Sequence, residues 1–137
     1  MSTAPEKPWL ILPCSGIGKP LGTITRWAAY DVIEHQKIPG IRTICLARLV
    51  DADPEALHIL QTHRILTIDG CPKKCATLNV ERNFGHVEKT YLMAKFVAKN
   101  KDLKIGNDVI DPGEDAVKMA KRIALEIEND VTQGGDA

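Results

Sequence analysis

Apolar residues in the first third of the chain fall into short runs separated by one helical stripe. The run Trp9 to Leu12 is bounded by prolines and predicts a short strand buried on both faces. Apolar positions then recur at helical spacing between residues 21 and 32, which predicts a helix over about 22–36 that Pro39 ends. The β-branched stretch 41–46 predicts a second strand.

The middle of the chain continues the same alternation. The sequence Asp-Pro-Glu combines an N-cap residue, a proline and a first-turn acid, and it opens a short helix over residues 53–60. A third β-rich run covers 65–68, and the segment 73–82 after it can be helical. The stretch 87–97 suits a strand in its first part and a helix in its second. The alternation favours a fourth strand at about 89–93.

A final helix is predicted to begin at Asp111, with a proline at its first position and Glu114 in a capping-box-like place. Glu114 and Lys118 are spaced to pair on its solvent side. Residues 130–137 are polar and are predicted to form a frayed tail. The buried stripe of this helix is expected to consist of Ala116, Ala120, Ile123 and Ile127.

Strands that alternate with helices predict an α/β fold, a Rossmann-like three-layer sandwich with a mainly parallel sheet. The length of 137 residues suits a single domain over residues 1–137. Lys and Arg together number 18, as do Asp and Glu, so the net charge is zero. Such a chain, with 4% aromatic residues, is not expected to bind nucleic acid, and no stretch predicts a membrane span or a signal peptide. We therefore expect a cytoplasmic protein.

The four cysteines are predicted to meet at one edge of the sheet. Cys14 follows the first predicted strand, Cys45 ends the second and Cys71 follows the third, so all three belong to the carboxyl edge. Cys75 comes four residues after Cys71, and in a helix the two side chains would share a face. Because cytosolic thiols stay reduced, such a cluster indicates metal or thiol chemistry.

Four thiolates are a standard ligand set for Zn²⁺, and helix N-termini near Lys19, Lys73 and Lys74 would offset their charge. The same set suits an iron–sulfur cluster. Cysteine is also among the most buried residue types, so Cys45, inside an apolar stretch, can equally be a small core residue.

Three segments together resemble a known family. Cys14-Ser-Gly, the cysteine-leucine-alanine segment at Cys45 and Asp69-Gly70-Cys71-Pro72 with Cys75 are similar to the DGC-domain family of zinc-binding proteins, named for its Asp-Gly-Cys motif. The resemblance covers roughly residues 9–112 and implies zinc binding without an established reaction. Arg48-Leu49-Val50 stands where the family often has glycines.

The loop after Cys14 could also cradle a small anion or a thiol ligand, although it lacks the spacing of a nucleotide-binding loop. Asp69 is expected to orient the Cys71 loop by accepting backbone N–H bonds. Cys14, beside Gly16 and Gly18 and before a helix N-terminus, is predicted to be the most reactive thiol.

Three functions remain open from the sequence. The first is a zinc-binding protein with a structural, sensory or metal-handling role. The second is a thiol or sulfur-chemistry enzyme with an open metal or iron–sulfur site near Cys14. The third is a partner-binding module in which the metal only holds the loops.

Overall fold

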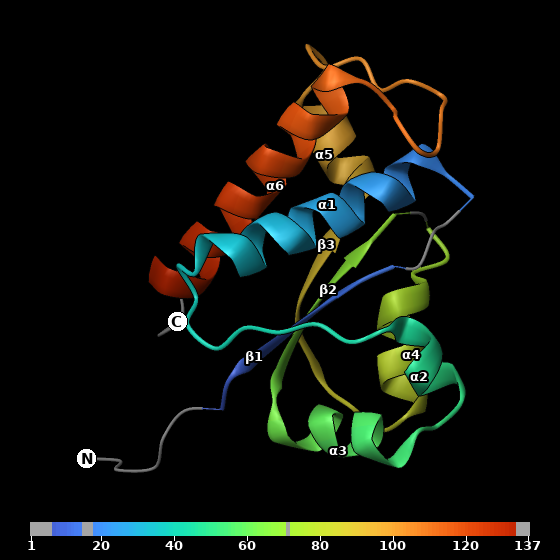
Figure 1. The fold of residues 1–137 in the computed structure, drawn as a ribbon, viewed down its shortest axis with the longest axis vertical. Coiled ribbons are helices and arrows are strands. Elements are labelled where there is room, and N and C mark those ends of the chain that lie inside the picture. The colour runs from blue at the N-terminus through green and yellow to red at the C-terminus, as the bar shows by residue number, and fades with distance from the viewer. Residues whose placement is uncertain (1–6, 15–17, 71, 134–137) are drawn as a thin grey trace.

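The computed structural model describes residues 7–14, 18–70 and 72–133. Its centre is an all-parallel sheet with the strand order β1-β2-β3 (Figure 1). The strands are β1 (Trp9–Pro13), β2 (Arg64–Asp69) and β3 (Val87–Leu92). The α/β fold with a parallel sheet is therefore confirmed. Its likeness to a Rossmann fold remains a prediction.

Helices cover both faces of this sheet, as Figure 1 shows. One face carries α1 (Pro20–His35), α5 (Met93–Lys99) and α6 (Glu114–Gln133). The other face carries α2 (Leu46–Val50), α3 (Pro54–Thr62) and α4 (Cys75–Arg82).

Each face of the sheet has its own apolar core. Side chains of β1 alternate, so that Ile11 joins the core under α1 and α6 while Leu10 and Leu12 join the core under α2, α3 and α4. The predicted stripe of α6 is confirmed, because all four of its residues are buried in the first core. Within residues 7–14, 18–70 and 72–133, no helix combines the length and the apolar character that crossing a membrane requires.

The predicted second strand at 41–46 is wrong. Among the residues that the structure describes, a single parallel bridge, between Leu10 and Arg42, lies beside β1 on the edge away from β2. Cys45 then acts as the N-cap of α2, and Leu46 is buried in the second core. The chain turns away from the sheet because burying this side chain outweighs the β-propensity of the stretch.

The other predicted elements of the middle region are confirmed with shifted ends. Asp53 caps α3 by accepting the N–H of Ala56 at 3.0 Å. The ambiguous stretch 87–97 contains both candidates, since β3 ends at Leu92 and α5 begins at Met93.

The N-terminus of α6 differs from the predicted capping box. The helix begins at Glu114, because Gly113 has a φ of +103° that ends any helical path from Asp111. Asp111 instead accepts the N–H of Gly113 through its side chain. Lys118 lies 3.8 Å from Asp115 rather than pairing with Glu114 as predicted.

The frayed tail predicted for 130–137 is wrong for residues 130–133, which belong to α6. The Tyr91 hydroxyl donates to Asp130 Oδ2 at 2.8 Å, and Val131 packs against the first core, so both residues hold the last turn. Residues 134–137 lie outside the described part of the chain.

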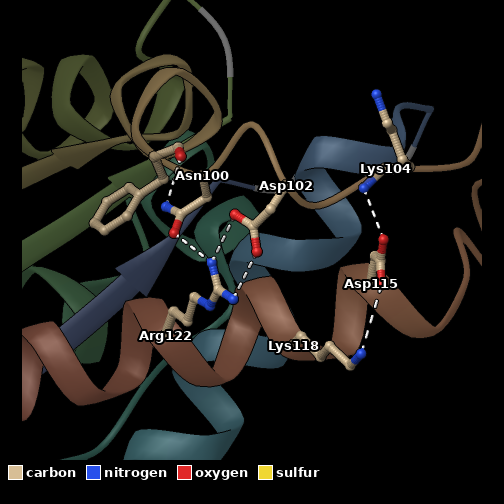
Figure 2. A network of polar contacts seen from close by, with 7 residues as sticks. Asn100, Asp102, Lys104, Asp115, Lys118 and Arg122 are labelled. Atoms are coloured by element: carbon tan, nitrogen blue, oxygen red, sulfur yellow. Dashed lines mark hydrogen bonds and ion pairs between the residues drawn. The ribbon is translucent and has the colours of Figure 1, made fainter.

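The connection from α5 to α6 is fixed by polar contacts (Figure 2). Arg122 of α6 donates to Asn100 Oδ1 at 2.7 Å and to Asp102 Oδ2 at 2.9 Å. Asp115, in the first turn of α6, accepts the backbone N–H of Lys104 at 2.8 Å. These contacts tie the start of the connection to α6.

Candidate metal site

Cys14 lies directly after β1 and joins two strand ends. Its backbone N–H donates to the carbonyl of Ile68 at 2.8 Å, which extends the β1–β2 pairing by one residue. Its side chain is buried, and its Sγ accepts the N–H of Gly70 at 3.3 Å. The Thr25 hydroxyl lies 3.7 Å from the same sulfur. The Cys14 thiol is therefore held beside the residue that precedes Cys71.

The packing at position 70 requires a glycine, because a larger residue would come too close to Cys14. A Cβ atom on Gly70 would stand 3.0 Å from Cys14 Sγ and 3.3 Å from the backbone nitrogen of Gly22. Both neighbours are in the packed interior, so neither can move away easily. The glycine of the Asp-Gly-Cys segment thus permits the close approach of β2 to Cys14.

We expect Gly70→Ala to lower the free energy of unfolding by about 1–3 kcal/mol, since it overpacks this contact. Gly18→Ala is the matched control, because a Cβ there meets no atom within 4 Å. It should change stability by less than about 0.5 kcal/mol. Denaturant unfolding of both variants measures the difference. Equal stabilities would show that the contact at Gly70 is not tight.

Cys45 lines two cavities, and a second cysteine lines each of them as well. A cavity of about 390 Å³ is lined by both Cys14 and Cys45. A second cavity, of about 420 Å³, is lined by both Cys45 and Cys75. The Cys45 side chain is exposed at the N-terminus of α2. Three cysteines from separate parts of the sequence therefore lie around one region at the carboxyl end of the strands.

Cys75 is the first residue of α4, and its position depends on Asp69. This aspartate is buried at the end of β2; its Oδ1 accepts the N–H of Ala76 at 2.9 Å, and its Oδ2 accepts the Thr77 hydroxyl at 2.6 Å. Asp69 thus caps the N-terminus of α4 from the end of β2. Asp69 accepts a backbone N–H bond as predicted, from Ala76 of α4, while the Cys71 segment that it is expected to orient includes a residue outside the described part of the chain.

A chain of threonine hydroxyl groups lies beside Asp69 at the start of α4. Thr67 of β2 is buried and lies 2.8 Å from the Thr77 hydroxyl and 3.0 Å from that of Thr90 on β3. This network is not among the features predicted from the sequence. The signal was a threonine in the middle of an otherwise apolar strand, because a buried hydroxyl needs a partner.

Cys71 itself lies outside the described residues. α4 begins at Cys75 and the described residues 72–74 are not helical, and the expectation that Cys71 and Cys75 would share a helix face concerns a residue outside the described part of the chain. In residues 7–14, 18–70 and 72–133, which omit Cys71, no three Cys, His, Asp or Glu side chains lie close enough together to hold a metal. The cysteines of this part of the chain surround the site without closing it.

The exposure of the thiols favours an order of reactivity different from the predicted one, in which Cys14 reacts first. Cys14 is 5% exposed, whereas Cys45 and Cys75 are exposed. A buried thiol is shielded from reagents in solution. We therefore expect brief alkylation of metal-free protein to modify Cys45 and Cys75 before Cys14, as read by peptide mass spectrometry. Labelling of Cys14 first would show that its surroundings open readily.

The model of a known protein family matches most of the chain. The model of the DGC domain matches residues 10–117. The chain belongs to the DGC domain family. The matched region of this DGC domain contains all four cysteines and extends into the first turn of α6. No curated protein and no solved structure matches the chain significantly.

Proposed function

We propose that this DGC domain is a cytoplasmic zinc-binding protein that holds Zn²⁺ through Cys14, Cys45, Cys71 and Cys75. The observation that carries the proposal is the place of Cys45, which lines one cavity with Cys14 and another with Cys75. The remaining ligand, Cys71, directly follows Gly70, whose N–H contacts Cys14 Sγ.

The residues present fit such an ion. Thiolate sulfur is a preferred zinc ligand, and four of them make a closed structural site. The N–H that Gly70 donates to Cys14 Sγ holds this sulfur beside the end of β2. Cys45 and Cys75 are exposed, so an ion from solution can reach them. When bound, zinc would supply positive charge that offsets the repulsion between the four thiolates.

The role that we propose for the zinc-bound protein is structural, sensory or metal-handling. A zinc ion held by these residues would join the end of β1, the start of α2 and the start of α4, which hydrogen bonds alone do not connect directly in the described residues. Such a cross-link would couple the geometry of this edge to metal occupancy.

Thiol or sulfur chemistry is the second candidate, and the cavity between Cys14 and Cys45 favours it. An enzyme of this class would leave one metal position open, or would use an iron–sulfur cluster. In that case the exposed Cys45 would be the sulfur that faces a substrate.

The test is anaerobic purification followed by metal and acid-labile sulfide analysis. We expect a colourless protein with one zinc per chain. Cys45→Ser should lose most of the zinc, whereas Val50→Ser, which changes an exposed residue in the wall of the Cys45–Cys75 cavity, should keep it. Brown protein with stoichiometric iron and sulfide would overturn the zinc proposal, and so would full zinc content in Cys45→Ser.

A further inference from the structure

The thiols of the proposed zinc site differ in how accessible they are from solution. Cys14 is 5% exposed, its backbone N–H donates to Ile68, and its Sγ accepts the N–H of Gly70 at 3.3 Å. Cys45 and Cys75 are both exposed. A molecule in solution can therefore reach Cys45 and Cys75, whereas Cys14 is fixed beside the end of β2.

The cavity shared by Cys45 and Cys75 has room for a small molecule. Its volume of about 420 Å³ lies within the range of small-molecule pockets. Its wall also contains Ala47 and Val50 of α2, both of which are exposed. Among the described residues, the charged side chain of this wall is Asp51, so the cavity suits a neutral molecule better than an anion.

Cys45 is less constrained than Cys14 or Cys75 in the part of the chain that the structure describes. It is the N-cap residue of α2, but its side chain makes no capping hydrogen bond. A second cavity, of about 390 Å³, is lined by Cys45 and Cys14, so there is space on two sides of the Cys45 side chain. Cys75, in contrast, begins α4, whose first turn is capped by Asp69.

We infer that this DGC domain exchanges zinc with small thiols through Cys45, and that the cavity shared by Cys45 and Cys75 admits the incoming thiol. The inference rests on the proposed zinc site and gives that site a metal-handling role. The incoming thiol gives its proton to the Cys45 thiolate that it replaces. The charge and the number of protons therefore stay the same, and the exchange needs no oxidant or reductant.

Transfer of zinc from the loaded protein to a chromogenic chelator, with and without β-mercaptoethanol, tests the inference. We expect this neutral thiol to speed the transfer about fivefold or more, because its sulfur can become a thiolate ligand. Its S-methyl derivative has almost the same size and no thiol, so it should leave the rate unchanged.

Ala47→Trp distinguishes exchange at this cavity from a general weakening of the zinc site. A bulky side chain in the cavity wall should lower the thiol-dependent rate about fivefold and leave the zinc content unchanged, whereas a weakened site would release zinc faster. Ala98→Trp, at an exposed position of α5, is the matched control and should keep the wild-type rate.

The outcomes separate this inference from the zinc proposal on which it rests. Protein that takes up no zinc would overturn both. Zinc-loaded protein whose transfer rate is the same with the thiol and with its S-methyl derivative would overturn only the exchange through Cys45, whether or not Ala47→Trp folds. A wild-type rate in folded Ala47→Trp would do so as well.

Discussion

Asp69→Ala is expected to lower the free energy of unfolding by about 2–4 kcal/mol. The carboxylate is 1% exposed and accepts two hydrogen bonds, from the N–H of Ala76 and from the Thr77 hydroxyl. Its removal would leave the first turn of α4 without a cap and the Thr77 hydroxyl without its shortest contact. Because Cys75 begins this helix, the zinc content should fall as well.

Urea unfolding and zinc analysis of the same samples measure both effects. Asp69→Asn keeps an oxygen that can accept the N–H of Ala76, so it should lose less stability than Asp69→Ala. Asp51→Ala removes an exposed acid nearby and serves as the surface control. A loss below about 0.5 kcal/mol for Asp69→Ala would show that the cap is not important to the fold.

Removal of zinc is expected to lower the melting temperature strongly. An ion that binds only the native state stabilises it by about 4 kcal/mol when its free concentration is a thousandfold above its dissociation constant. We expect dialysis against a chelator to lower the thermal midpoint, and added Zn²⁺ to restore it. The thiolates must also be deprotonated to bind, so the stabilisation by zinc should decrease as the pH falls.

Cys45→Ser provides the control for this experiment. It changes a side chain at an exposed position, so the metal-free fold should be little affected. Its melting temperature should respond weakly to either the chelator or Zn²⁺. A wild-type midpoint that stays constant after verified removal of the metal would exclude a structural role for zinc.

The parts of the fold that the sequence predicts well are those where the hydrophobic pattern decides. The run Trp9 to Leu12 is buried on both faces of the sheet, and the stripe of α6 faces the first core. Residues 41–46 show where such reasoning fails. Their β-branched side chains suit a strand, but the burial of Leu46 in the second core is a tertiary contact that no local pattern contains.

The predicted topology places the cysteines at one edge of the sheet. This still holds for Cys45, although the strand predicted at 41–46 does not form. Arg42 still pairs in parallel with β1, so Cys45 reaches the same edge without belonging to a strand. The burial of Cys14 could not be predicted, since it depends on the approach of Gly70 from β2. The threonine network beside Asp69 joins three separate elements, so the lone threonine in the apolar strand β2 is its one signal in the sequence, and the partners of that threonine are tertiary contacts.

Zinc K-edge X-ray absorption of the purified protein tests the central proposal most directly. If Cys14, Cys45, Cys71 and Cys75 hold the ion, the spectrum will fit four sulfur neighbours at about 2.3 Å and no oxygen or nitrogen neighbour. A first shell with two or fewer sulfurs, completed by oxygen or nitrogen, would contradict the four-cysteine site.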